Sequence, residues 1–228
     1  MLKFLGIGDA FSSSLGNTSA FYKKDNSLIL IDCGENIFER IIQNDILSDI
    51  DKVYIIITHF HSDHIGSIGT LLFYLDKIGI KDTSIIYPNK KSLTLLLKLF
   101  GVQKCNYEVL SPSEEEDFNI REIKQSHSFM EAYGYLMRID DKTIYYSGDT
   151  KSLSNEVLEM LMSNEIDYFY QDIREGINDY HISLEELNGL VPIEYRDKIQ
   201  CMHISESINR DEITRAGYRL VKEYRRWL

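Results

Sequence analysis

One nine-residue stretch restricts this chain more than any other. Residues 58–66 have the sequence THFHSDHIG, with three histidines and an aspartate at His59, His61, Asp63 and His64. Neutral imidazole is a common metal ligand, and such a dense polar cluster is poorly suited to an apolar core. The run DKVYIIITH, which ends at His59, is typical of a buried strand. The stretch therefore predicts part of a metal site at the end of a strand.

Three later strand-like runs end at side chains that can also bind a metal. The runs NIREIKQSH, KTIYYSGDT and IQCMHIS end at or near His127, Asp149 and His203. Open α/β folds place ligand sites at the carboxyl ends of their strands, so these ends indicate one shared centre. Two metals about 3.5–4 Å apart are a known hydrolytic device. Such a pair needs more than four ligands, and the three later residues can supply the remainder.

The rest of the chain alternates strand and helix patterns. Strands are expected at 3–8, 27–34, 51–59, 83–88, 119–127, 132–140, 142–150, 166–172 and 199–205. Helices are expected at 35–46, 65–79, 90–101, 154–162 and 183–191. An amphipathic helix over 209–228 is expected to pack through Ile213, Tyr218, Leu220, Val221 and Trp227. Because no linker or repeat interrupts the pattern, we expect an α/β fold with a single domain over 1–228.

Composition argues against several classes of function. The formal net charge of −11 and the pI near 5.0 argue against a broad grip on nucleic acid, which needs a basic surface. The three cysteines are too widely spaced for a paired-cysteine motif: Cys33, Cys105 and Cys201. This spacing predicts that they are reduced thiols in a cytoplasmic protein. No stretch approaches the roughly 18 apolar residues of a membrane span, so no membrane partner is expected.

The complete H-x-H-x-D-H motif at 59–64 resembles the metallo-β-lactamase superfamily, and the resemblance runs from about Leu2 to Ser205. It implies a four-layer αβ/βα sandwich with two divalent metals at one edge. It also implies two ligand sets bridged by Asp149: His59, His61 and His127 for one metal, and Asp63, His64 and His203 for the other. Branches with iron and oxygen chemistry replace His61 by an acid. The histidine here favours a hydrolase with zinc, or alternatively manganese.

Three segments narrow the resemblance to one branch. The chain resembles the ribonuclease Z-like nucleases and phosphodiesterases in these segments: GIGDAFSSSLGNTSAF at 6–21, HSFMEAYGYLMRIDDKTIYYSGDT at 127–150 and YHISLEELNGL at 180–190. The PGHT turn of glyoxalase-type hydrolases is missing. The resemblance implies that His181 acts as an acid oriented by an upstream carboxylate, for which Asp172 is the nearest counterpart. The expected catalytic residues are therefore Asp63, His181 and Asp172.

His181 is also supported by an argument that needs no family. Ser183 and Glu186 have the spacing of a capping box, which predicts that His181 lies just before a helix, near the metal edge of the sheet. A phosphodiester needs a proton for its departing alkoxide, and histidine titrates in the right range to supply one. We therefore expect a dinuclear metal-dependent hydrolase that cleaves a small or single-stranded nucleotide or phosphate ester.

Two other functions stay open at this point. The same metals could hydrolyse a lactone or a thioester, a reaction that would not need His181. A non-catalytic regulator that binds a metal or a nucleotide could also keep the ligands, although seven ligands are costly to retain without chemistry. The sequence likewise leaves a homodimer open as an alternative to a monomer.

The region from Asn89 to Gln125 generates a first prediction. Transfer-RNA-processing relatives carry a long basic arm, whereas this region is short and turns acidic at SPSEEEDF. Folded precursor transfer RNA should therefore bind weakly at about 0.15 M salt and should not be cleaved at a single 3′ site. Gel-shift and cleavage assays measure both properties. Tight binding with cleavage at one position would contradict the prediction.

Overall fold

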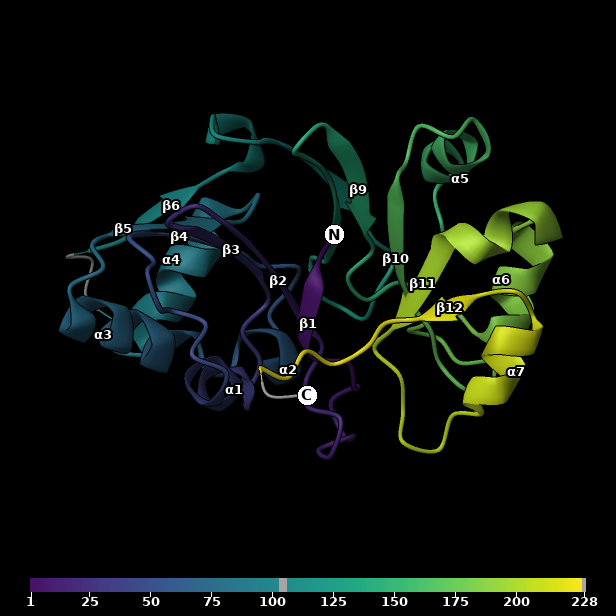
Figure 1. Ribbon diagram of the computed structural model, residues 1–228, viewed down its shortest axis with the longest axis horizontal. Coiled ribbons are helices and arrows are strands. Elements are labelled where there is room, and N and C mark those ends of the chain that lie inside the picture. The colour runs from purple at the N-terminus through teal and green to yellow at the C-terminus, as the bar shows by residue number, and fades with distance from the viewer. Residues whose placement is uncertain (103–105, 227–228) are drawn as a thin grey trace.

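The computed structural model describes residues 1–102 and 106–226, and within them two six-stranded sheets face one another (Figure 1). The first sheet runs in sequence order and comprises β1 (Lys3–Gly6), β2 (Ser19–Lys24), β3 (Ser27–Ile31), β4 (Lys52–Ile56), β5 (Asp82–Ile86) and β6 (Glu108–Leu110). The second runs in the order β12-β11-β10-β9-β8-β7 and comprises β7 (Asn119–Lys124), β8 (Tyr133–Ile139), β9 (Lys142–Tyr146), β10 (Tyr168–Asp172), β11 (Ile199–Met202) and β12 (Arg219–Leu220).

Helices cover the outer face of each sheet (Figure 1). The helices of the first half are α1 (Ile37–Gln43), α2 (Ser62–Ile65), α3 (Ile68–Ile78) and α4 (Lys90–Leu99). Those of the second half are α5 (Asn155–Met162), α6 (Leu184–Leu190) and α7 (Arg210–Arg215). Two short 3₁₀ turns span Pro112–Glu114 and Ile193–Lys198.

Strand β3 shows why four layers form. Its sequence SLILI carries two buried sets, because successive side chains of a strand point to opposite faces. Leu28 and Leu30 belong to the core beneath α1, α3 and α4, whereas Ile29 and Ile31 belong to the core between the two sheets. A strand that is covered on both faces needs such a continuous apolar run. The predicted four-layer αβ/βα sandwich is confirmed.

Parallel pairing brings the functional loops to one edge. Strands β3 to β6 pair in parallel, and so do β9 to β12. The carboxyl ends within each parallel set therefore lie together. The loops that carry His59, Asp149 and His203 follow β4, β9 and β11. The sandwich thus places candidate ligands from both sheets at the same edge.

The C-terminal segment differs from the predicted long helix. Helix α7 ends at Arg215, and Gly217 follows in the left-handed region with φ +99°. The chain then pairs with β11 as β12, and Tyr224 N donates to Phe4 O at 2.7 Å. Ile213, Tyr218 and Val221 are buried and Leu220 is partly buried, as predicted. Trp227 lies outside the described residues.

Two smaller differences concern the helix expected over 65–79 and two strands that the pattern did not predict. The helix is divided into α2 and α3, so Asp63 and His64 lie on a short helix of their own. Strands β2 and β6 were not expected. Strand β2 has the mixed sequence SAFYKK, and β6 has three residues, so neither carries a long apolar run.

Two tyrosine–aspartate–lysine clusters join the sheets at the edge opposite the functional loops. In the first cluster, the Asp140 carboxylate, in the turn between β8 and β9, accepts hydrogen bonds from Tyr22 and Lys24 of β2. In the second, Asp117 accepts from Tyr54 and Lys52 of β4. Each aspartate thereby connects the second half of the chain to the first sheet at its amino-terminal side.

Two composition-based expectations can be compared with the fold. Cys33 and Cys201 are buried free thiols, and Cys105 lies outside the described residues. Within the described ranges, none of the helices has both the length and the apolar character needed to cross a membrane.

The end of α7 generates a stability prediction. Replacing Gly217 by alanine should lower the free energy of unfolding by about 1–2 kcal/mol, because a Cβ is disfavoured in the left-handed region. The nearest atom to that Cβ is 3.4 Å away, an ordinary contact, so the cost arises from the backbone. Gly189→Ala in α6 is the control, since that Cβ meets nothing within 4 Å and alanine should stabilise a helix by about 0.5–1 kcal/mol. Urea denaturation measures the free energy of unfolding of both variants, and stabilisation of both would contradict the prediction.

Candidate metal centre

The loop after β4 is fixed by close backbone packing. Cys33 N donates to His64 O at 2.7 Å, which ties the loop to the end of β3. A Cβ on Gly34 would lie 2.0 Å from Asp63 O, so only glycine permits this approach. The H-x-H-x-D-H segment is therefore held in place from the neighbouring strand.

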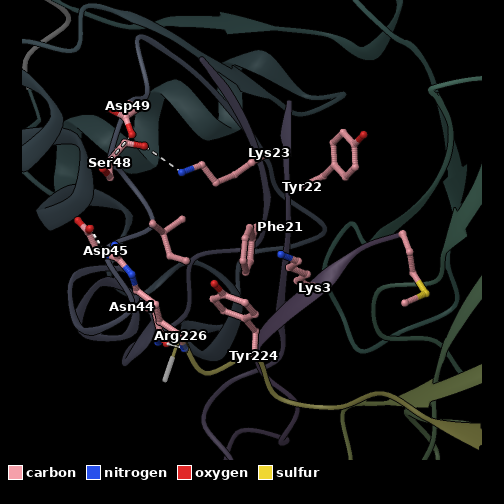
Figure 2. A pocket seen from close by; sticks show the side chains of 12 residues that line it. Lys3, Phe21, Tyr22, Lys23, Asn44, Asp45, Ser48, Asp49, Tyr224 and Arg226 are labelled. Atoms are coloured by element: carbon pink, nitrogen blue, oxygen red, sulfur yellow. Dashed lines mark hydrogen bonds and ion pairs between the residues drawn. The ribbon is translucent and has the colours of Figure 1, made fainter. Parts of the chain in front are cut away.

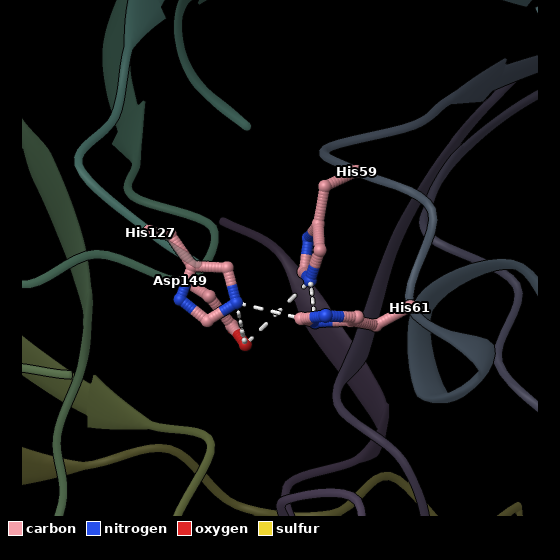
Figure 3. Close-up of side chains that lie close together, drawn as sticks. All are labelled: His59, His61, His127 and Asp149. Atoms are coloured by element: carbon pink, nitrogen blue, oxygen red, sulfur yellow. Dashed lines mark hydrogen bonds and ion pairs between the residues drawn. The ribbon is translucent and has the colours of Figure 1, made fainter. Parts of the chain in front are cut away.

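Four predicted ligands form a first group, in which three histidines gather near the Asp149 Oδ2 atom (Figure 3). His59 Nε2 lies 2.9 Å from His61 Nδ1, which lies 3.2 Å from His127 Nε2. The Nε2 atoms of His59 and His127 are each 3.8 Å from Asp149 Oδ2. Three imidazole nitrogens and one carboxylate oxygen thus converge on one point.

A second group gathers around the other oxygen of the same carboxylate. His64 Nε2 lies 3.3 Å from Asp63 Oδ2 and 3.3 Å from Asp149 Oδ1. His203 Nε2 lies 3.3 Å from Asp63 Oδ2 and 3.5 Å from Asp149 Oδ1. The seven predicted ligands therefore form two groups that share Asp149.

The spacing of these donor atoms fits divalent metals. Ligand atoms about 2.0–2.2 Å from a tetrahedral zinc lie about 3.4 Å from one another, close to the separations in both groups. The Nε2 atom of His64 is buried and has no hydrogen-bond partner. A buried polar atom without a partner is costly in a fold, and a cation at the centre of the group would satisfy it.

The protonation of the histidines in the first group also suits a metal. Burial lowers the pKa of His59 well below its ordinary value, and burial likewise lowers the pKa of His61 and of His127. These rings are therefore neutral, which is the form that binds metals. In the second group, burial alone would lower the pKa of His64, but the carboxylates around it raise that pKa above its ordinary value. A cation would take the place of the proton that these carboxylates favour.

Asp32 contacts one of the candidate metal ligands, His64, and was not predicted as part of the site. Its Oδ2 atom lies 2.8 Å from His64 Nδ1, and its oxygens also accept from Thr58 N and Thr58 Oγ1. Carboxylates in this position fix the ring orientation of metal ligands. The signal that could have revealed Asp32 is its place at the end of β3, next to the strand that leads to His59.

His181 and Asp172 meet beside the Asp149 carboxylate that the two groups share. His181 Nδ1 lies 2.7 Å from Asp172 Oδ2 and 3.9 Å from Asp149 Oδ2. The His181 ring stacks on that of His203, with centroids 5.2 Å apart. The predicted capping box is present, since Ser183 and Glu186 exchange hydrogen bonds at the start of α6. Burial raises the pKa of Asp172 above its ordinary value, and the hydrogen bond with His181 only partly offsets this shift.

A cavity of about 380 Å³ opens over these groups. Its wall includes predicted site residues of both halves, among them His61, Asp63, His127, Asp149, His181 and His203. A separate cavity of about 300 Å³ lies beside β1 and β2 (Figure 2) and shares none of the predicted site residues. Its basic side chains have partners within its own wall: Lys23 with Ser48 O, Arg226 with Asp45, and Lys3 over the ring of Tyr224. The first cavity is therefore the candidate site.

Comparison with known proteins identifies the family. The family model described as anti-Pycsar protein Apyc1 matches residues 1–227. The chain belongs to the anti-Pycsar protein Apyc1 family. This Apyc1-family chain is 28% identical to the anti-Pycsar protein Apyc1 of Bacillus phage BSP38, over 95% of this chain and 93% of that protein.

Solved structures of other proteins share the fold of this chain. A diphosphatase from the PhnP family superposes with a TM-score of 0.76 and 22% identity, covering 97% of this chain and 94% of that one. The short form of human tRNase Z gives a TM-score of 0.73 and 16% identity, covering 98% and 96%. These likenesses confirm the predicted metallo-β-lactamase fold.

The two groups generate a prediction about metal content. Elemental analysis should find about two transition-metal ions per chain, as in dinuclear hydrolases. His203→Ala should lower the content by about one ion, and Asp149→Ala should lower it further, because Asp149 faces both groups. The exposed Asp211→Ala variant is the control and should keep both ions. Retention of full metal content by Asp149→Ala would contradict the two-group arrangement.

Proposed function

We propose that this chain is a dinuclear metal-dependent phosphodiesterase that hydrolyses small cyclic nucleotides. The observation that carries the proposal is the His181–Asp172 pair, 2.7 Å apart, beside the shared Asp149 carboxylate. Membership of the anti-Pycsar family, whose members degrade cyclic nucleotides, supports this substrate class. The acidic charge of the chain supports a small substrate over a folded RNA.

The seven ligands would hold two ions, which we propose to be zinc, with manganese as the alternative. The two sets are those described above: His59, His61 and His127, then Asp63, His64 and His203, with Asp149 between them. When bound, a pair of divalent ions supplies a nucleophile at neutral pH and polarises the phosphoryl group. The chain's own contribution is to hold the donors at fixed separations, through Asp32 and through the Tyr180 O atom that lies 3.0 Å from His127 Nδ1.

His181 is proposed to act as the general acid. Its Nδ1–H donates to the Asp172 carboxylate, which stabilises the protonated ring and leaves Nε2 free to face the substrate. Hydrolysis forms one P–O bond to the oxygen of water and breaks one P–O bond to a ribose oxygen. The Nε2 proton moves to that departing oxygen, which leaves as a hydroxyl group.

The shape and the lining of the cavity also support a nucleotide. Its volume of about 380 Å³ is at the lower end of the range for ligand pockets, roughly 300–1,000 Å³. Phe11 and Tyr180 line it and are exposed by 86% and 44%. Stacking of a base on an aromatic side chain contributes about 1–3 kcal/mol. A nucleobase would therefore find apolar surface next to the proposed phosphate site.

A substitution of His181 separates this proposal from lactone or thioester hydrolysis. His181→Ala should slow hydrolysis of a cyclic nucleotide by about 10²–10⁴-fold, the usual contribution of a positioned general acid. The loss should be much smaller on bis-p-nitrophenyl phosphate, whose nitrophenolate departs without a proton. Steady-state kinetics on the two substrates measure the contrast, and elemental analysis checks that metal content is unchanged.

Asp172→Asn provides a second arm of the same experiment. It keeps the size of the side chain but removes the charge that stabilises protonated His181, so it should lower activity on the cyclic nucleotide by less than His181→Ala. A folding defect or a loss of metal would depress both substrates equally. Equal losses on both substrates, or a loss on neither, would argue against the proposed acid and for a lactone or thioester substrate.

A further inference from the structure

Arg174 introduces a positive charge into the wall of the candidate site. Among the described residues that line the 380 Å³ cavity, it is the one lysine or arginine. It lies two residues after Asp172, and its backbone pairs with Ser183 across the loop that carries His181. Arg174 and His181 both line the cavity, so this loop brings a guanidinium and the proposed acid to the same site.

A buried carboxylate holds the Arg174 guanidinium from the other half of the chain. Asp9 Oδ2 lies 3.0 Å from Arg174 Nη1, and the Asp9 side chain is only 2% exposed, compared with 29% for Arg174. Asp9 is itself fixed, because its Oδ1 atom accepts from Phe11 N and its backbone N donates to Ile204 O. The guanidinium is thus anchored at one nitrogen, while the side chain as a whole stays partly exposed.

We propose that Arg174 binds a phosphate oxygen of the substrate, with Asp9 as the residue that positions it. This inference rests on the proposed function. A guanidinium carries five N–H donors in a planar fork, and the Arg174 side chain pairs with one carboxylate among the described residues, that of Asp9. Arginine suits phosphate because two of its N–H groups can bind two oxygens at once. Among the described residues of the cavity wall, Arg174 is the one lysine or arginine that could bind a phosphate oxygen beside the two proposed metal ions.

The ion pair makes a simple substitution ambiguous. Arg174→Gln would remove the proposed phosphate contact but would also leave the Asp9 carboxylate buried without a partner, which destabilises a fold. The double variant Arg174→Gln with Asp9→Asn removes that unpaired charge. A merely structural ion pair predicts that the double variant recovers both stability and substrate binding. A phosphate-binding arginine predicts recovery of stability alone.

The experiment compares wild type, the single variant, the double variant and Arg121→Gln. Arg121 is the matched control, since it loses the same charge from an exposed pair with Glu156 outside the cavity. Steady-state kinetics are measured on 3′,5′-cyclic nucleotides, and calorimetry measures binding of inorganic phosphate to the metal-loaded proteins. Thermal denaturation reports stability. The phosphate measurement tests Arg174 even in a protein that turns over no cyclic nucleotide, so failure of the proposed function is seen separately.

Charge-assisted hydrogen bonds of this kind lead us to expect a loss of about 10- to 100-fold in phosphate affinity for Arg174→Gln. KM for the cyclic nucleotide should rise by a similar factor, with a smaller change in kcat. The double variant should keep these losses while regaining wild-type thermal stability, and Arg121→Gln should resemble wild type. The inference is overturned if the double variant regains phosphate affinity, or if Arg174→Gln binds phosphate as wild type does.

Discussion

A single buried carboxylate, that of Asp149, faces two groups of histidines at once. One oxygen lies near His59 and His127, and the other lies near His64 and His203. Asp149 follows β9 of the second sheet, whereas His59 and His64 follow β4 of the first. The apolar core between the sheets therefore sets the separation of the ligands. Any change in how the sheets pack would alter both groups together.

The sequence predicted those parts of the site that show a local pattern. The H-x-H-x-D-H motif and the strand-end positions located the seven candidate ligands, and the capping box placed His181 at a helix start. The family resemblance, not the capping box, indicated Asp172 as its partner. Asp32 was missed because one aspartate after an apolar strand has no distinctive pattern. Arg174 was missed because its partner Asp9 lies in the other half of the chain. Pairings between distant segments depend on tertiary packing, which periodicity does not encode.

Local backbone strain occurs at two residues of the same centre. Asp32 and His203 both have positive φ, at 62° and 57°, in a region that residues with a Cβ rarely adopt. Such conformations cost of order 1–3 kcal/mol each and persist where the surrounding structure enforces them. Here the enforcement comes from buried contacts: Asp32 binds His64 and Thr58, and the Ile204 N that follows His203 donates to Ile7 O. The rigid frame is thus stabilised by the neighbouring sheets.

The tyrosine–aspartate–lysine clusters at the opposite edge have a mechanical consequence. Asp117 and Asp140 tie the two sheets together at the amino-terminal side of β4 and β9, far along the strands from the metal ligands. The sheets are also joined at the functional edge, where Tyr133 N donates to Thr58 O and Ile204 N donates to Ile7 O. Two sheets that are fastened at both edges cannot swing apart about either one. Access of a bulky molecule to the cavity is therefore set by the loops around its mouth and not by separation of the sheets.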